Sequence, residues 1–195
     1  MFFNLFKSKE KSGSTNKKRI NEKTGYQMST DKQINVAKEK VELLKKYKPV
    51  DNEFFTDEMR YSNKVIDFVL PHYNKGDYYY KTGEWDKAEN EWLMILKLMG
   101  HFPTIKLAIM YRKQKRFSDE VELLKLSQIY ARKNTVYPRT KVINERIPKA
   151  EKFREKHINE DKSKGFDKNK IIQKLFWKNM EVSICLIMFI KITKN

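Results

Sequence analysis

The stretch that decides the fold is residues 72–132, HYNKGDYYYKTGEWDKAENEWLMILKLMGHFPTIKLAIMYRKQKRFSDEVELLKLSQIYAR. When it is aligned with itself so that residue 76 meets residue 108, side chains of the same kind coincide. The coinciding pairs are Gly76 with Ala108, Tyr79 with Tyr111, Trp85 with Phe117, and Trp92 with Leu124. Self-similarity at an offset of this length is typical of repeat architectures built from one supersecondary unit. We therefore expect two copies of one unit.

Within each copy, the spacing predicts two helices joined by a tight turn. Gly76 would let a neighbouring helix approach closely, and Gly83 would take the left-handed conformation that ends a helix. Asp86 is expected to cap the next helix, with Glu89 at the capping-box spacing. In the second copy Ser118 is expected to be the cap. The inner face of the second helix of the first copy is predicted to be Ala88, Trp92, Ile95 and Met99.

This ladder of residues resembles the tetratricopeptide repeat (TPR). The match in the first copy is carried by Gly76, Tyr79, Gly83, Trp85, Ala88 and Trp92. The second copy departs from the pattern, because Lys115 replaces the turn glycine and Glu120 replaces a small residue. The end-of-repeat proline is also missing from the first copy, although Pro103 lies close. The resemblance covers about a third of the chain. The alternative is an unrelated helical hairpin.

The resemblance implies an all-α fold, a short right-handed α-solenoid of antiparallel helical hairpins, with the best repeats at about 69–100 and 101–134. In TPR proteins the first helices of successive hairpins line a concave groove that binds a peptide. Carried over by spacing, the groove residues would be Tyr73, Asp77, Tyr80, Lys81, Ile105, Ile109, Arg112 and Lys113. This mixture suits a peptide with apolar anchors and an acidic end. The alternative for Ile105 and Ile109 is that they are ordinary core residues.

Two such units rarely suffice alone, so flanking helices are expected to pack on both sides. Thr30 begins the first helix, over 31–48, with Gln33 at the capping-box position and an apolar face of Ile34, Ala37, Val41 and Leu44. A second helix begins at Thr56 and is expected to end or kink at Pro71. A segment at 138–158, kinked by Pro148, would pack after the repeats as a polar-faced cap.

The expected organisation is a flexible basic arm at 1–30, a helical domain at 31–158, and a C-terminal part at 159–195. The C-terminal part divides into a charged linker (159–170) and an apolar end (171–195). Three interpretations of the apolar end stay open: it docks on the core, lies at a membrane surface, or pairs with a partner. Its run VSICLIMFI at 182–190 is too short to span a bilayer.

The formal net charge of +17 is concentrated at the two ends. Residues 1–50 carry +8, residues 51–135 carry +1, and residues 136–195 carry +8. Basic arms around a nearly neutral domain favour contact with polyanions such as nucleic acid or an anionic membrane. The alternative is that the lysines only keep the chain soluble.

The sequence contains no recognisable catalytic motif. The only cysteine, Cys185, excludes an intramolecular disulfide and fits a reducing cytoplasm. The three histidines stand far apart, and neither a phosphate-binding loop nor a nucleophile elbow is present. We therefore expect no enzyme, no metal, no cofactor and no small-molecule substrate.

The leading functional hypothesis is a cytoplasmic protein–protein interaction scaffold that binds a partner or peptide in the groove. The first alternative is a nucleic-acid-associated protein that uses its basic tails. The second is a peripheral membrane protein anchored weakly by apolar and basic residues near its start, namely Phe2, Phe3, Leu5, Phe6, Lys7, Lys9 and Lys11.

Overall fold

The computed structural model describes residues 29–49, 52–99, 101–133 and 140–171, and these residues are all-helical. They form seven α-helices and two short 3₁₀ helices, and none of the residues described is in a strand. The α-helices are α1 (Asp31–Lys46), α2 (Asp57–Thr82), α3 (Trp85–Met94), α4 (Leu96–Met99), α5 (His101–Lys113), α6 (Phe117–Lys133) and α7 (Thr140–Lys156). The 3₁₀ helices are η1 (Ile158–Glu160) and η2 (Lys168–Lys170).

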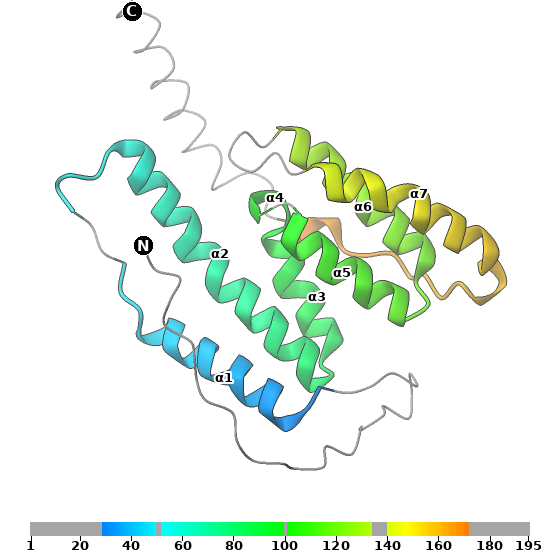
Figure 1. The fold of residues 1–195 in the computed structure, drawn as a ribbon, viewed down its shortest axis with the longest axis horizontal. Helices are drawn as coiled ribbons and strands as arrows, with labels where there is room; N and C mark the ends of the chain where they lie inside the picture. Colours follow the sequence, from blue (N-terminus) through cyan, green and yellow to red (C-terminus); the bar gives the residue numbers. More distant parts are fainter. Residues whose placement is uncertain (1–28, 50–51, 100, 134–139, 172–195) are drawn as a thin grey trace, which may run out of the picture.

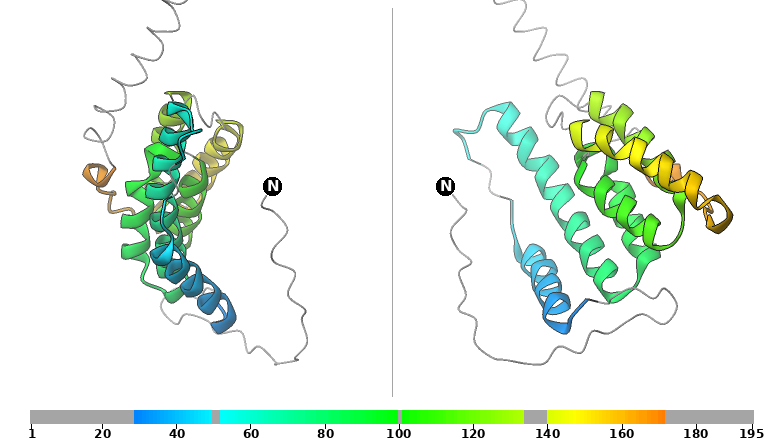
Figure 2. Two further views of the ribbon diagram at one scale, coloured as in Figure 1. Left: turned by 90° about the vertical axis from the view of Figure 1, so that its left-hand side faces the viewer. Right: turned by 45° about the vertical axis from the view of Figure 1, so that its right-hand side comes forward.

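The helices pack mainly on their neighbours in sequence (Figure 1). α1 contacts α2, α2 contacts α3, α5 contacts α6, and α6 contacts α7, while α3 also contacts α5. α1 and α7 therefore lie at opposite ends of the array, as the turned view in Figure 2 also shows. The core is continuous from α2 to α7, and its largest fully buried side chains include Trp92, Tyr111, Leu107, Leu124 and Ile143.

Gly76 and Trp92 set the close approach of α2 and α3. A Cβ atom added at Gly76 would lie 2.3 Å from Nε1 of Trp92, which is closer than real Cβ atoms come to other heavy atoms. Trp92 Nε1 donates a hydrogen bond to the carbonyl oxygen of Tyr73, at 3.2 Å. Gly76 and Ala108 are both buried, so the prediction that small residues permit close helix packing is confirmed at Gly76.

The turns that follow α2 and α5 repeat one another at the predicted offset, which carries residue 83 to residue 115. Gly83 has φ 85° and Lys115 has φ 60°, both in the left-handed region. Glu84 N donates to Tyr79 O at 2.8 Å, and Arg116 N donates to Tyr111 O at 2.8 Å. The bonds that close the tighter turn also correspond, Gly83 N to Tyr80 O and Lys115 N to Arg112 O. Lys115 therefore adopts the same left-handed conformation as Gly83, its counterpart at the predicted offset.

Some helix boundaries agree with the sequence and others do not. The capping box of Thr30 and Gln33 is confirmed, and Thr56 caps α2 through Met59 N. However, α2 does not end at Pro71 but continues as a helix to Thr82. A proline inside a helix costs roughly 3 kcal/mol, and here the packing of α2 on α1 and α3 offsets that cost. α7 likewise contains Pro148 within its length.

The two predicted side-chain caps are wrong. α3 begins at Trp85, one residue before Asp86, and its N-cap residue Glu84 makes no side-chain capping bond. α6 begins at Phe117, so Ser118 lies inside the helix. The first amides of α6 are instead capped by a distant residue, Asp161, which accepts hydrogen bonds from Phe117 N at 2.9 Å and Ser118 N at 3.1 Å.

Residues 161–171, most of which were expected to belong to a charged linker, lie against α3, α5 and α6. Ser163 Oγ accepts from Asp119 N at 3.0 Å, and Asp119 in turn accepts from Gly165 N at 3.0 Å. Phe166 stacks on Tyr111 with ring centroids 6.0 Å apart, and Ile171 is fully buried. We call residues 161–171 the C-terminal strap.

A buried charge cluster lies where the strap meets the helices. Arg116, which is 2% exposed, pairs with Glu89 at 2.7 Å and Asp119 at 2.6 Å, and donates to Gly165 O at 2.8 Å. The Tyr111 hydroxyl donates to Glu89 at 2.9 Å. Burial, followed by the adjacent Glu89 carboxylate, raises the pKa of Tyr111. Because Arg116 contacts Gly165 of the strap as well as Glu89 on α3 and Asp119 on α6, this buried cluster links the strap to the helices.

Candidate functional site

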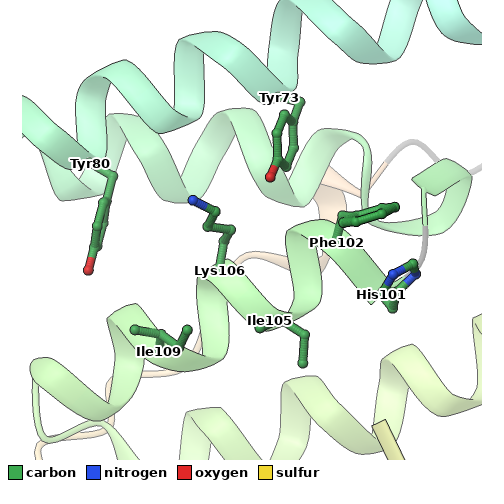
Figure 3. Close-up of a pocket in the computed structure, with 7 residues that line it drawn as sticks. All are labelled: Tyr73, Tyr80, His101, Phe102, Ile105, Lys106 and Ile109. Atoms are coloured by element: carbon green, nitrogen blue, oxygen red, sulfur yellow. The ribbon is translucent and has the colours of Figure 1, made fainter. Parts of the chain in front are cut away.

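One surface hollow in the part of the chain described lies between α2 and α5 (Figure 3). Its cavity volume is about 310 Å³. The lining side chains are mostly apolar or aromatic and are Tyr73, Tyr80, His101, Phe102, Ile105, Lys106 and Ile109. We call this hollow the tyrosine pocket. Four of the eight predicted groove residues line it: Tyr73 and Tyr80 from α2, and Ile105 and Ile109 from α5.

A second, smaller hollow lies beside the first and is lined by apolar residues. Its cavity volume is about 120 Å³, and we call it the aliphatic pocket. The side chains around it come from α2, α4 and α5 and are Val65, Ile66, Val69, Leu70, Leu98, Met99 and Phe102. Phe102 belongs to both pockets and is 43% exposed. It therefore forms the wall between two adjoining apolar hollows.

Asp77 on α2 binds two lysines, and one of them, Lys106, joins α2 to α5. Its carboxylate pairs with Lys81 Nζ at 2.6 Å and with Lys106 Nζ at 2.8 Å. Burial alone would raise the pKa of Asp77, but the hydrogen bonds from the two lysines outweigh it and hold the pKa below its usual value. Burial alone would lower the pKa of Lys106, but the hydrogen bond to Asp77 leaves it raised. The site thus holds two ammonium groups around one carboxylate.

Lys113 adds a third cation beside the tyrosine pocket. Its Nζ donates to the hydroxyl oxygen of Tyr80 at 2.7 Å, so α5 and α2 are bridged again. Tyr80 is held on its other side by Trp85, with stacked rings whose centroids are 5.9 Å apart. The structure therefore brings Asp77, Tyr80, Lys81 and Lys113 together around the tyrosine pocket.

Arg112 faces a different part of the molecule. Its Nε and Nη2 donate to the two carboxylate oxygens of Glu120, each at 2.8 Å. The guanidinium also lies over the ring of Phe153, 4.7 Å from its centroid. Arg146 from α7 reaches the same carboxylate at 3.3 Å. Arg112 therefore joins α5 to α6 and α7, and the structure does not bring it to the tyrosine pocket.

Three lining residues were missed by the sequence reasoning, namely His101, Phe102 and Lys106. Leu70, which lines the aliphatic pocket, meets Phe102 at the offset that carries residue 76 to residue 108, so extending the repeat comparison toward the N-terminus would have found Phe102. Lys106 follows the predicted Ile105, and only its contact with Asp77 shows that it turns toward α2. His101 is only 8% exposed.

Among the described residues there is no group of three or more metal-binding side chains. The carboxylate of Asp77 forms ion pairs with lysines, and those of Glu89 and Asp119 form ion pairs with Arg116. None of the helices in the described ranges is long and apolar enough to cross a membrane.

Comparison with known proteins gave no match to a protein-family model, a curated sequence or a solved structure.

Proposed function

We propose that this protein is a non-catalytic interaction module built from TPR-like helical hairpins, which binds a segment of a partner protein in the groove between α2 and α5. The observation that carries the proposal is the tyrosine pocket, because half of the residues selected by the repeat spacing line it. A concave, mostly apolar hollow with a few placed polar groups is the usual form of a binding site.

Support for TPR-like units comes from the turns. The helix ends at Gly83 and Lys115, which the repeat offset relates, make the same pair of backbone hydrogen bonds around a left-handed residue. At the end of α7 only one of these hydrogen bonds recurs, from His157 N to Arg154 O at 3.1 Å after the buried Ala150, and His157 has φ −118°, outside the left-handed region. Ala150 would then correspond to the small residues at 76 and 108. In this proposal α2, α5 and α7 are the first helices of successive units.

In the proposed third unit, α7 is followed among the described residues by η1 and then by the strap, which contains η2 and runs back along α3 and α6. We infer that the strap covers α3 and α6, the second helices of the first two proposed units, which leaves the groove side for a partner.

The polar groups of the groove favour a ligand with negative charge. Lys81 and Lys106 share the carboxylate of Asp77, and Lys113 contacts the hydroxyl of Tyr80 beside them. Complementary potential at a rim mainly raises the association rate and selects the partner, while apolar contacts at the centre supply most of the affinity. A partner segment with apolar anchors and acidic residues fits both features.

The proposal can be tested by comparing the partners retained by two surface variants of the full-length chain. Ile109→Asp places a charge in the tyrosine pocket, and Ile129→Asp places one on α6, away from both pockets; their native side chains are 37% and 49% exposed. Proteins bound to the tagged chain are quantified with and without nuclease treatment. We expect a set of nuclease-resistant partners that Ile109→Asp loses and Ile129→Asp keeps.

Two results would overturn the proposal. If Ile109→Asp and wild type retain the same partners, the groove does not bind them. If every partner disappears after nuclease treatment, the chain is associated with nucleic acid through its basic residues, which is the alternative raised by the charge of +17.

A further inference from the structure

The groove does not stop at the tyrosine pocket. The aliphatic pocket continues it along α2 toward the N-terminus of that helix, and the exposed ring of Phe102 separates the two hollows. Ile66, on the rim of the aliphatic pocket, is 41% exposed. Two adjoining apolar hollows on one helix provide two places for large side chains of one ligand.

The two ends of this groove differ in charge. All side chains that line the aliphatic pocket are uncharged and apolar. The cations are at the other end, where Lys106 lines the tyrosine pocket, Lys81 shares Asp77 with it, and Lys113 contacts Tyr80. A ligand that matches the groove is therefore apolar toward the N-terminus of α2 and acidic toward its C-terminus.

The spacing of the pockets along α2 limits the ligand further. On α2, the aliphatic pocket is lined by residues 65, 66, 69 and 70, and the tyrosine pocket by residues 73 and 80. Their midpoints are roughly nine residues apart, or about 13 Å along the helix axis. A helical ligand covers that distance with side chains about eight residues apart on one face, and an extended ligand does so with side chains about four residues apart.

We propose that the groove binds one segment of another protein that inserts two large apolar side chains, one on each side of Phe102, and turns carboxylates toward Lys81, Lys106 and Lys113. This inference rests on the proposed function, since it names the ligand of the same groove. It adds a second binding pocket, a direction of charge and a spacing between anchors.

Charge decides between a foreign partner and this chain itself. Residues 1–28 contain seven Lys and Arg against two Asp and Glu, and residues 172–195 contain four against one. A second copy would bring a formal charge of +17. Each of the two tails, and a second copy of the chain, would bring positive charge near the cationic end of the groove. An acidic segment is instead attracted to that end. The ligand is therefore an acidic segment from a different protein.

The inference can be tested with a displayed library of random 16-residue peptides, selected on the immobilised full-length chain with the Ile129→Asp variant as a matched surface control. Enriched peptides are expected to carry two large apolar residues at a constant spacing, about eight if helical or about four if extended, with Asp or Glu beyond one of them. The best peptide is then titrated against each variant by fluorescence anisotropy.

Changes at each pocket should act on one anchor. Ile66→Asp is expected to lower the affinity for the two-anchor peptide at least about tenfold. Ile66→Ala is expected to lower this affinity less, in proportion to the apolar area removed. A peptide whose anchor for the aliphatic pocket is replaced by Ser should bind wild type and Ile66→Asp equally. The affinity for this Ser-substituted peptide should still be lowered by Ile109→Asp. Circular dichroism establishes that each variant is folded.

The possible results separate the two proposals. If peptides with one apolar anchor are selected and Ile66→Asp changes their affinity less than about twofold, the second pocket is not a binding site, but the groove still is. Basic or uncharged peptides would refute the assigned charge. If no peptide binds wild type better than Ile109→Asp, the proposed function itself fails. If deleting residues 1–28 or 172–195 strengthens peptide binding, the chain's own tail occupies the groove and the assignment to a foreign partner is wrong.

Discussion

The indole of Trp92 occupies the space that a side chain at residue 76 would need, since a Cβ atom on Gly76 would lie 2.3 Å from Trp92 Nε1. This contact sets the distance between α2 and α3 and thereby positions Tyr73, which accepts a hydrogen bond from the same indole. The tyrosine pocket therefore depends on the absence of a side chain at residue 76.

Gly76→Ala is expected to destabilise the protein by about 1–3 kcal/mol, the usual cost of adding a methyl group to a packed interior. The intrinsic preference of a helix for alanine acts in the opposite direction by roughly 1 kcal/mol, so a net loss would show that the clash dominates. Urea unfolding followed by circular dichroism measures the change. Gly76→Ala at equal or greater stability than wild type would mean that Trp92 moves aside without cost.

Lys115 provides a second prediction, because it holds a φ of 60° that L-residues other than Asn and Asp rarely adopt. Lys115→Gly should relieve this strain and raise stability by about 0.5–1 kcal/mol. The change also removes the exposed ion pair of Lys115 with Glu160, and Lys115→Ala removes that pair while keeping a Cβ atom. The free energy of unfolding should therefore be higher for Lys115→Gly than for wild type. The value for Lys115→Ala should be equal to or lower than that of wild type. An Ala variant as stable as the Gly variant would contradict the backbone explanation.

Asp161 connects the C-terminal strap to α6, and its removal is a third prediction. Asp161→Ala removes the acceptor of Phe117 N and Ser118 N and should cost about 1 kcal/mol, as for other helix caps. The strap should then open more often, which is measurable as faster amide hydrogen exchange in residues 162–167. Unchanged exchange in this segment would mean that Phe166 and Ile171 hold the strap without the cap.

The same carboxylate gives the stability of the protein a pH dependence with a definite sign. Burial would raise the pKa of Asp161, but hydrogen bonds from Ser118, Ser163 and the amide of Phe117 outweigh it and lower the pKa. A lowered folded-state pKa means that the contribution is complete above the unfolded-state value and is lost as pH falls through the folded-state value. Wild type should therefore lose more stability than Asp161→Asn between neutral and acidic pH. Parallel pH profiles would exclude this role for Asp161.

Local features of the fold followed from the sequence, whereas contacts between distant segments did not. Thr30, Gly76 and Gly83 have their roles fixed within a few residues or by the repeat spacing, and the structure has them in those roles. Asp161 caps a helix that begins 44 residues earlier. No periodicity or capping rule relates residues at such a separation. The charged composition of 161–171 therefore predicted a linker, and its packing against the helices could not be predicted.

The groove was also predictable only in part, because helix register follows from the local sequence and contacts between distant residues do not. Tyr73, Tyr80, Ile105 and Ile109 are given by the helix register and line the tyrosine pocket. Arg112 belongs to that register too, but a buried acidic residue, Glu120, draws it toward α6. The signal was present as a departure from the TPR pattern, since Glu120 stands where a small residue is usual. A buried carboxylate needs a cationic partner, and Arg112 is near enough to supply one.

The buried cluster supports a last prediction, because Arg116 neutralises two carboxylates at once. Arg116→Met keeps most of the side-chain length but leaves Glu89 and Asp119 buried without their cation, and should cost about 3–5 kcal/mol. Changing Glu89 to Gln and Asp119 to Asn in the same chain removes the charges that Arg116 balanced, so the triple variant should recover much of this loss. Thermal and urea unfolding of the variants measures the recovery. A triple variant as unstable as Arg116→Met alone would show that Arg116 acts through its hydrogen bond to Gly165 O and its packing on Tyr111, and not through charge.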